Sequence, residues 1–317
     1  MTRDTTPLLI GDEEVRARLD AGTAVAAVRR ALLAHHRKEL AAPARLAAPV
    51  GDRDLVFTAG ADTAGARHGF RAYDTRGGAQ LVAVWDSAGG ALLAVVHGQE
   101  LGPRRTGAIG AVAVDALARP DAARLGVIGA GTQAYAQLWA LAQVRRPAEV
   151  TVFARRPERL RAFVARVRAE LGLAAEAAPA AEEAVRGQDV VITATSSRSP
   201  VLEADWVAPG THISTLGTKT RTGSEIPPEL IARADVLVTD SRAQTAAYGP
   251  DHLIDPAAAA ELGAVLAGEA PGRASAGQIT LFSSVGLAGT EVAVAAELAP
   301  RGAGGPPQSP GSSSGVG

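Results

Sequence analysis

A single run of ten residues, Leu125 to Ala134, limits the possible folds of this chain more than any other part of the sequence. It reads Leu-Gly-Val-Ile-Gly-Ala-Gly-Thr-Gln-Ala. The apolar start predicts a buried strand, the glycines predict a tight turn, and the residues after them open a helical pattern. A second strand pattern, residues 150–153, follows that helix. This order is typical of the first βαβ unit of a Rossmann domain.

The chemistry of the turn favours a dinucleotide. Gly129 permits the tight turn, Gly131 lets the backbone approach a pyrophosphate, and Ala134 keeps the helix close to the strand. The free N–H groups at the start of the helix favour an anion. A glycine turn in a domain that binds no nucleotide is the alternative. The predicted cofactor contacts here are Gly129, Ala130, Gly131, Thr132, Gln133 and Ala134.

The rest of the chain predicts two lobes. Strand patterns at residues 190–194, 212–216 and 236–239 continue the alternation and predict an α/β fold with a doubly wound parallel sheet. Before it, residues 13–36 have helical spacing, short strand runs with a hairpin turn at residues 86–90 follow, and residues 107–117 form a helix of small residues. A strand at residues 279–284 and a helix come later. The Gly, Pro and Ser of residues 301–317 predict a disordered tail.

Composition excludes several classes of function. The 317 residues include no cysteine, so disulfides and thiolate chemistry are excluded, and we expect no metal site. The net charge of −1 predicts neither a nucleic-acid surface nor an anionic-membrane surface. The N-terminus does not resemble a signal peptide and no apolar run is long enough to span a bilayer, so we expect a cytoplasmic protein. Lys38 and Lys219 are the only lysines.

The end of the second Rossmann strand bears on the choice of cofactor. An acid there would accept the ribose hydroxyls of NAD, but the chain has Arg155 and Arg156 after Ala154. Guanidinium groups pair well with a 2′-phosphate, so we expect NADP(H), with NAD(H) still open. The alternative is that both arginines cap a solvated loop.

Several segments together resemble the ornithine cyclodeaminase/mu-crystallin family. They run in the family's order over almost the whole chain: Pro43-Ala44-Arg45, Gly69-Phe70-Arg71, Arg105-Thr106-Gly107-Ala108, the turn from Val127 to Ala134, Trp206 to Ile213, Val238-Thr239-Asp240-Ser241 and Phe282 to Gly286. The resemblance implies that residues 1–119 and 279–300 form a substrate-binding and dimerisation lobe, that residues 120–278 form the Rossmann domain, and that the protein is a homodimer.

The resemblance also implies an active site in the cleft between the lobes, with a small carboxylate-bearing substrate. Arg45 and Arg105 match arginines that hold the substrate's α-carboxylate in the family. The alternative for Arg45 is a surface loop arginine. Further cofactor contacts are predicted at Ala194, Thr195, Ser196, Gly217, Ser284, Val285 and Gly286, the last three facing the nicotinamide by family analogy.

Two positions depart from the family pattern. Arg71 replaces a lysine, and either binds a second anionic group of the substrate, as in a dicarboxylate or a phosphorylated compound, or reflects general replacement of lysine by arginine. Lys219 stands where cyclodeaminases have an aspartate, and a cation there disfavours a cationic iminium. Lys219 is either a proton donor or a solvated loop lysine. His97 and Tyr73 are weaker acid candidates, and we expect Asp240 to cap the following turn.

These features predict an NADPH-dependent reductase of a small carboxylate-bearing imine, such as a cyclic imino acid or ketimine. Candidate catalytic residues are Lys219, Arg71 and His97, and candidate substrate-binding residues are Arg45, Arg71 and Arg105. Three alternatives remain: an amino-acid dehydrogenase or reductive condensing enzyme, a cyclodeaminase with other catalytic residues, and an inactive protein that binds NADPH and a ligand.

Overall fold

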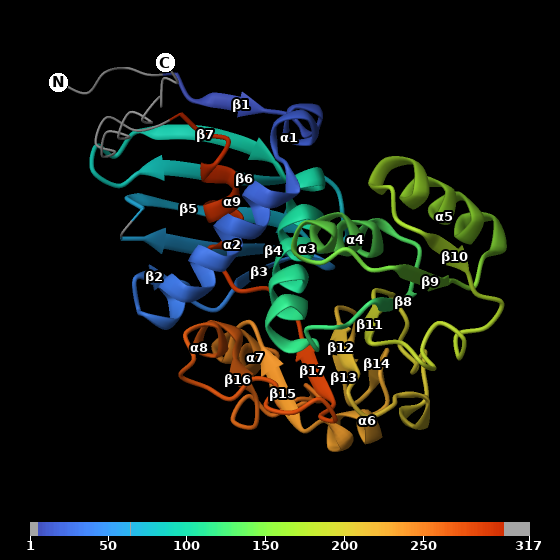
Figure 1. Ribbon diagram of the computed structural model, residues 1–317. Coiled ribbons are helices and arrows are strands. Elements are labelled where there is room, and N and C mark those ends of the chain that lie inside the picture. The colour runs from blue at the N-terminus through green and yellow to red at the C-terminus, as the bar shows by residue number, and fades with distance from the viewer. Residues whose placement is uncertain (1–5, 64, 301–317) are drawn as a thin grey trace, which may run out of the picture.

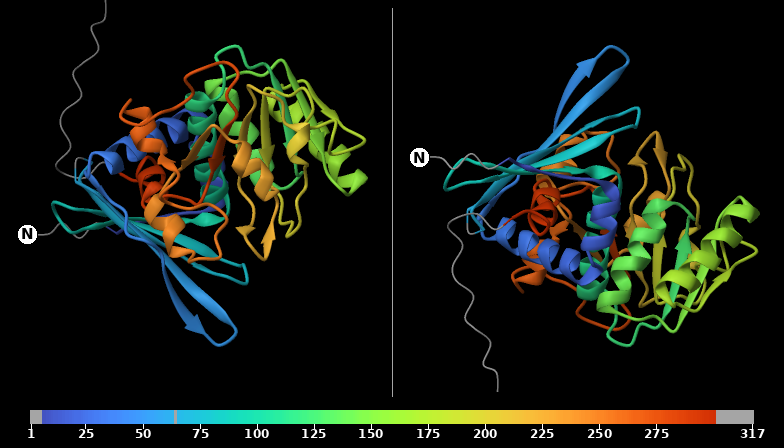
Figure 2. Two further views of the ribbon diagram at one scale, coloured as in Figure 1. Left: turned by 90° about the horizontal axis from the view of Figure 1, so that it is seen from below. Right: turned by 90° about the horizontal axis from the view of Figure 1, so that it is seen from above.

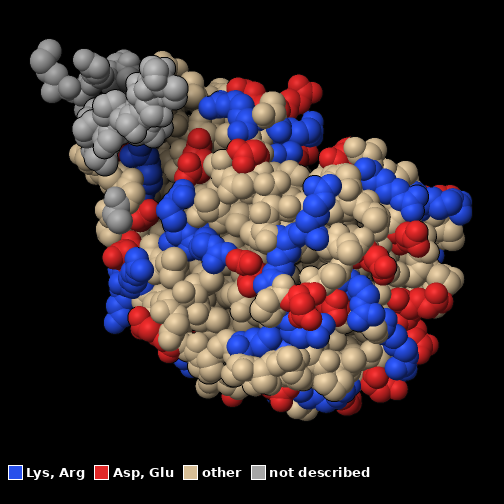
Figure 3. Space-filling view, viewed as in Figure 1, with Lys and Arg blue, Asp and Glu red and all other residues tan. Residues whose placement is uncertain are grey.

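The computed structural model of the protein describes residues 6–63 and 65–300, so the predicted disordered tail lies outside the described residues. The described chain forms two large sheets on either side of the long helix α3 (Gly98–Leu117) (Figure 1). The predicted α/β class with a parallel sheet in one part is confirmed. None of the described helices combines the length and hydrophobicity that a membrane span requires. Basic and acidic side chains are interspersed over the face drawn in Figure 3.

The first sheet is a mostly antiparallel layer from the N-terminal part of the chain. Its strand order is β1-β7-β6-β5-β4-β2, and β3 also pairs with β4. The predicted hairpin joins β6 to β7, and its Gly90 adopts a φ of 68° that favours glycine. The strands are β1 (Leu8–Ile10), β2 (Leu40–Ala41), β3 (Leu46–Val50), β4 (Arg53–Asp62), β5 (Arg67–Asp74), β6 (Gln80–Asp86) and β7 (Leu92–His97).

Helices cover one face of this sheet and leave its other face open (Figure 2). The covering helices are α2 (Ala21–His36) and α9 (Thr290–Ala296), with α1 (Asp12–Arg18) at the edge. The sequence predicted helical structure over residues 13–36, and the structure divides this segment into the two helices α1 and α2. Asp20 breaks the helix because its carboxylate caps α2, accepting a hydrogen bond from the N–H of Thr23 at 2.8 Å.

The second sheet is the predicted Rossmann sheet, with eight parallel strands in the order β10-β9-β8-β11-β12-β17-β15-β16. The strands are β8 (Arg124–Ile128), β9 (Glu149–Phe153), β10 (Ala175–Ala177), β11 (Val190–Thr193), β12 (His212–Thr215), β15 (Val236–Thr239), β16 (Ala260–Glu261) and β17 (Thr280–Ser283). The other elements here are α4 (Thr132–Val144), α5 (Pro157–Leu171), α6 (Pro228–Arg233), α7 (Arg242–Ala247), α8 (Leu262–Leu266), the 3-10 helix η1 (Ala204–Trp206) and the hairpin of β13 (Lys219–Thr220) and β14 (Gly223–Ser224).

Strand β17 belongs to the second sheet, although the lobe boundary expected at residue 279 would assign it to the first lobe. All four of its residues are buried, and it lies between β12 and β15 in the middle of the second sheet. A fully buried strand of this kind is typical of a parallel sheet with both faces covered. The segment that returns to the first sheet is therefore only the loop after Ser283 and helix α9, which packs on β5 and β6.

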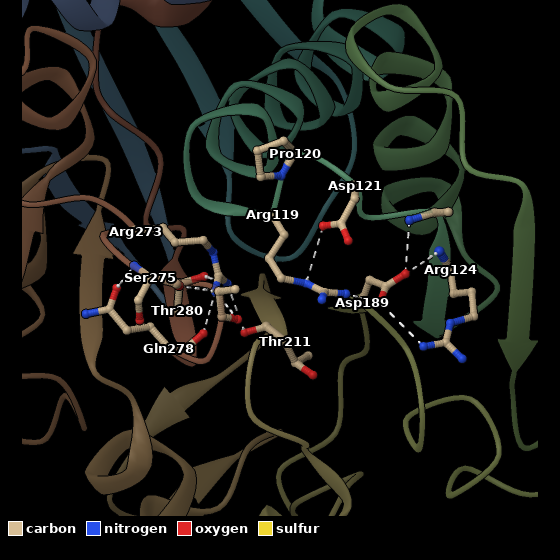
Figure 4. A network of polar contacts seen from close by, with 12 residues as sticks. Arg119, Pro120, Asp121, Arg124, Asp189, Thr211, Arg273, Ser275, Gln278 and Thr280 are labelled. Atoms are coloured by element: carbon tan, nitrogen blue, oxygen red, sulfur yellow. Dashed lines mark hydrogen bonds and ion pairs between the residues drawn. The ribbon is translucent and has the colours of Figure 1, made fainter.

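Helix α3 links the two sheets. A Cβ added to Gly107 would lie 2.1 Å from the carbonyl oxygen of Ala136, so α3 and α4 pack backbone to backbone. Beyond the C-terminus of α3, Asp189 accepts hydrogen bonds from Arg119 and from the N–H of Arg124 (Figure 4). Arg273 donates to the carbonyl of Leu117 at 2.7 Å. This network fastens α3 to the amino ends of the parallel strands, so a site between the lobes lies at the opposite edge.

Candidate active site between the two sheets

The glycine turn between β8 and α4 has the shape that a dinucleotide requires. Gly129 has a φ of 127°, and an added Cβ would lie 2.4 Å from the carbonyl oxygen of Ala194. Gly131 is the N-cap residue of α4, and a Cβ built there would meet nothing within 4 Å. Its surroundings therefore leave room for a phosphate against the backbone.

The first turn of α4 supports the same reading. It has no side-chain cap and no acidic residue, so its free N–H groups face outward without a protein anion. Ala134 is fully buried, which holds the helix close to β8. These residues fit a bound pyrophosphate.

The other predicted cofactor contacts lie at the same edge, because the carboxyl ends of parallel strands meet there. Arg155 and Arg156 follow β9 and are exposed. Ala194, Thr195 and Ser196 follow β11, Gly217 follows β12, and Ser284, Val285 and Gly286 follow β17.

Glu225, which the sequence analysis did not single out, fixes two of these loops. It is fully buried, and its Oε1 accepts hydrogen bonds from the hydroxyls of Thr193 and Thr215, both at 2.8 Å. Its Oε2 accepts from the N–H of Thr195 at 3.0 Å. A Cβ added to Gly217 would lie 2.5 Å from the carboxyl carbon of Glu225, so this position requires glycine. The carboxylate thus ties the ends of β11 and β12 together.

Asp240 fixes the loop after β17 in the same way, by accepting hydrogen bonds from it. It is buried and accepts hydrogen bonds from the N–H groups of Val285 at 2.9 Å and Gly286 at 2.8 Å. Burial raises the pKa of Asp240, and the two N–H donors oppose that rise. The prediction that Asp240 caps the next turn is wrong, because Ser241 caps α7 by accepting from the N–H of Gln244.

Three arginines from separate segments converge beside this edge. Arg71 on β5 and Arg105 on α3 both pair with the same oxygen, Oε1 of Glu291 on α9, and the Arg71 contact measures 3.1 Å. The Arg71 guanidinium stacks over the ring of Tyr73 at 4.2 Å, and Arg45 donates to the Tyr73 hydroxyl at 3.4 Å. We call Arg45, Arg71, Tyr73, Arg105 and Glu291 the arginine ring.

The arginine ring contacts the loop after β17 at two points. Nη2 of Arg45 donates to the carbonyl of Val285 at 3.0 Å. Gly286 has a φ of 83°, and a Cβ added there would lie 2.9 Å from Nη1 of Arg105. The two arginines expected to bind carboxylate therefore meet the loop expected to face the nicotinamide.

Burial makes the arginine ring a strong site for anions. The side chain of Arg105 is 7% exposed, and burial together with the neighbouring Arg71 lowers the pKa of Arg105 to about 9. Arg105 thus remains a cation at neutral pH. Burial also lowers the pKa of Arg71. The Nε atoms of Arg45 and Arg105 are buried without hydrogen-bond partners among the described residues, and such donors fit a bound anion.

The sequence predicted a helix over residues 107–117, which would place Arg105 just before its start, but Arg105 lies inside the longer helix α3. Helix α3 begins at Gly98, because Gly98, Leu101 and Gly102 are buried and extend the helix by packing on the first lobe. Arg105 therefore projects from the interior of α3, with Glu291 as the anionic partner that a buried guanidinium needs.

Lys219 is buried at the start of β13, so the alternative of a solvated loop lysine is wrong. Its Nζ donates to the carbonyl of Gly217 at 2.6 Å. Burial lowers the pKa of Lys219 to about 8, while the nearby carboxylates of Glu225 and Asp240 act in the opposite direction. Since Asp240 also influences Arg105, Lys219 and the arginine ring share one electrostatic environment.

The structure does not bring His97 into this cluster. Arg71 on β5 pairs with Val82 on β6, which in turn pairs with Val96 on β7, so these three residues share one face of the sheet. His97 is the next residue after Val96 and pairs with Leu81. Because side chains alternate between the faces of a sheet, His97 lies on the open face and Arg71 on the helix-covered face. His97 is exposed, so the structure does not support it as a catalytic acid.

Glu291 and Glu225 carried no signal that sequence reasoning could have used. An acid in the first turn of a helix, such as Glu291, is ordinarily explained by the helix dipole. Glu225 stands before Ile226 and two prolines and belongs to no pattern with a known chemistry. Only the folded chain places each carboxylate among its partners.

Comparison with known proteins agrees with this geometry. The sequence model of the ornithine cyclodeaminase/mu-crystallin family matches residues 69–301. The chain belongs to the ornithine cyclodeaminase/mu-crystallin family. An iminosuccinate reductase of Paracoccus denitrificans is 39% identical to this chain over 208 residues, which are 64% of each chain. The first curated relatives are matched over only 60% of their length.

Solved structures of relatives cover more of the chain. A Delta(1)-pyrroline-2-carboxylate reductase of Thermococcus litoralis, in complex with NADH and L-proline, has a TM-score of 0.83 and 28% identity over 92% of this chain and 95% of that chain. An archaeal alanine dehydrogenase dimer with bound NAD has a TM-score of 0.83 and 31% identity over 92% of this chain and 94% of that chain.

Proposed function

We propose that the protein is a nicotinamide-dependent reductase of a small imine that carries a carboxylate, such as a cyclic imino acid or ketimine. The arginine ring supports this most directly, because it places buried guanidinium groups against the loop after β17 at the edge where the dinucleotide turn lies. The relatives named above include two imine reductases and an amino-acid dehydrogenase, whose reactions are of this chemistry.

The backbone from Gly129 to Ala134 would hold the pyrophosphate of the cofactor. The loop from Ser284 to Gly286, which Asp240 fixes through backbone hydrogen bonds, would lie against the nicotinamide. When bound, the reduced nicotinamide supplies a hydride to the carbon of the C=N group, and the π electron pair becomes the lone pair of the amine. Arg45 and Arg105 orient the substrate through its carboxylate without taking part in proton transfer.

Lys219 is the proposed proton donor. Its lowered pKa of about 8 keeps the ammonium group mostly protonated at neutral pH, yet able to release a proton to the substrate nitrogen. A substrate that arrives as an iminium needs no proton, and the Lys219 cation disfavours that form. Lys219 in place of the family's aspartate thus weighs against cyclodeamination through a cationic iminium.

The decisive measurement is the absorbance of the reduced nicotinamide with a panel of cyclic imino acids and with oxo acids plus ammonium. We expect stoichiometric oxidation of the cofactor. A cyclodeaminase would instead convert ornithine or lysine while regenerating its dinucleotide. Tight cofactor binding without oxidation by any C=N or C=O substrate would contradict the proposal and leave a ligand-binding protein.

We further propose NADP(H) as the preferred cofactor, on the two exposed arginines after β9. Replacing Arg155 and Arg156 by serine should weaken NADPH binding about tenfold or more, because charge-assisted hydrogen bonds contribute about 1.5–3 kcal/mol. Calorimetry with NADH is the control, since NADH has no 2′-phosphate. Equal losses for both cofactors would contradict this assignment.

We also propose that the protein is cytoplasmic and forms a homodimer through the open face of the first sheet. This face carries three aromatic side chains: the ring centroids of Phe57 and Phe70 are 6.1 Å apart, and those of Phe70 and Trp85 are 5.6 Å apart. Leu81 on the same face is 37% exposed. A large uncovered apolar face of this kind marks an interaction site. Light scattering should give a dimer for the wild type and a monomer for Phe70→Arg; a monomeric wild type would contradict the proposal.

A further inference from the structure

The arginine ring holds more positive charge than its own acid can match. Arg71 and Arg105 share a single oxygen of Glu291, whose side chain is 2% exposed. Arg45 has no ion pair among the described residues; its side chain contacts the Tyr73 hydroxyl, the Val285 carbonyl and the face of the Tyr248 ring at 4.7 Å. Glu291 is thus the carboxylate that pairs directly with the ring, while Asp240 acts on Arg105 from farther away and is itself held by backbone N–H groups.

Each guanidinium also keeps free hydrogen-bond donors. An arginine has five N–H donors, of which Arg71 uses three, two to Oε1 of Gln80 and one to Glu291. Nε of Arg105 and Nε of Arg45 are buried without partners among the described residues. These free donors favour an anion from outside the chain.

The three arginines differ in their neighbours. Arg45 and Arg105 both contact the loop at Val285 and Gly286, which is the side expected to face the nicotinamide. Among the described residues, the side-chain partners of Arg71 are Gln80, Glu291 and the ring of Tyr73, and none of them belongs to this loop.

We propose that the substrate is a 2-imino dicarboxylate whose carboxylate next to the C=N group binds Arg45 and Arg105 and whose second carboxylate binds Arg71. This inference rests on the proposed function. Two carboxylates would accept from the guanidinium donors that Glu291 leaves free on both sides, and a planar carboxylate suits the fork of a guanidinium. Arg71 is thus the residue that determines specificity for the dicarboxylate.

The test uses substrates that differ by one carboxylate. Oxaloacetate and pyruvate, each with ammonium and reduced cofactor, form such a pair, as do L-aspartate and L-alanine in the oxidative direction. We expect kcat/KM to be at least about 100-fold higher for the dicarboxylate of each pair, in keeping with the loss that an unpaired buried charge causes. Calorimetry of the cofactor complex should likewise show tighter binding of succinate than of butyrate, a readout independent of turnover.

Variants of Arg71 assign the effect. Arg71→Gln should lower the ratio of the two kcat/KM values about 30-fold or more, mainly through KM for the dicarboxylate. Arg71→Lys keeps a cation and should restore most of the ratio, with circular dichroism and thermal melting checking that both variants fold. An unchanged ratio in Arg71→Gln would overturn the role of Arg71.

The two proposals fail separately. Efficient reduction of pyrroline-2-carboxylate or of the pyruvate imine, with no preference for the dicarboxylate, would overturn this inference and leave the reductase standing. Failure to oxidise the cofactor with any of these substrates would overturn both.

Discussion

The glycine turn after β8 and the arginine ring are the two halves of the proposed site, and they are built differently. The turn is a run of consecutive residues that presents backbone N–H groups, and Gly129 and Gly131 act there through the Cβ that they lack. The arginine ring takes its side chains from a loop, a strand and two helices, and Glu291 holds two of them in place. The turn should therefore be sensitive to added volume, whereas the ring should be sensitive to changes of charge.

The largest expected effect separates the two halves of the site. Arg105→Ala should lower kcat/KM for carboxylate substrates by about 10³-fold, because truncating one partner of a buried charge pair costs about 2–5 kcal/mol. Calorimetry should show nearly unchanged dinucleotide binding. If the variant retains full turnover, or if it loses the dinucleotide as well, the separation of roles is wrong.

Glu291→Gln tests the charge balance of the arginine ring. Removing this acid leaves Arg71 and Arg105 without an ion-pair partner among the described residues, and we expect a loss of about 3–5 kcal/mol in the free energy of unfolding. KM should rise as the guanidinium groups lose their fixed positions.

The C-cap residue of the same helix, Glu297, provides a matched control for Glu291. Glu297 pairs with Arg30 at a more exposed site, where both side chains are at least 34% exposed. Glu297→Gln should change stability by less than about 1 kcal/mol, as exposed ion pairs do. Equal losses in urea denaturation of both variants would contradict a special role for Glu291.

Gly131→Ala tests the turn by volume alone. The added Cβ meets nothing in the protein, so the melting temperature should hold, but it occupies the space where a phosphate approaches. Binding of the reduced dinucleotide should weaken about 30-fold, a cost of about 2 kcal/mol. The matched change Gly129→Ala should lower stability as well, because of its positive φ and the nearby Ala194 carbonyl. Unchanged affinity in Gly131→Ala would place the dinucleotide elsewhere.

The smallest effect concerns Lys219, between the two halves. Its pKa is lowered to about 8, so a proton donor at this position is lost as pH rises, and kcat should fall about tenfold for each pH unit above about 8. Lys219→Met should lack this limb. A wild-type profile that stays flat to pH 10 would exclude Lys219 as the donor.

Stability gives an independent readout of the same group. The folded protein holds fewer protons at Lys219 than the unfolded chain between about pH 8 and the ordinary lysine value of 10.5, so the stability contribution of Lys219 should rise with pH over that window. Urea denaturation at several pH values, with Lys219→Met as the reference, measures it.

The sequence predicted the Rossmann half in detail because its signals are local. The strand, glycine turn and helix around Gly129, and helix α5, follow from spacing and turn chemistry. The break of the N-terminal helix at Asp20 was missed, since a cap inside a continuous helical pattern competes with that pattern. The place of β17 was missed because a buried apolar run does not specify its neighbours in a sheet.

By itself, the sequence determined the fold class, the dinucleotide turn and the family, since each depends on residues close together or on motifs in a fixed order. Only the tertiary structure decided that Glu291 pairs with Arg71 and Arg105. It alone also showed that Lys219 is buried and that His97 lies on the open face of the first sheet. The physical reason is that burial and charge pairing depend on contacts between distant segments. No periodicity along the chain records such contacts.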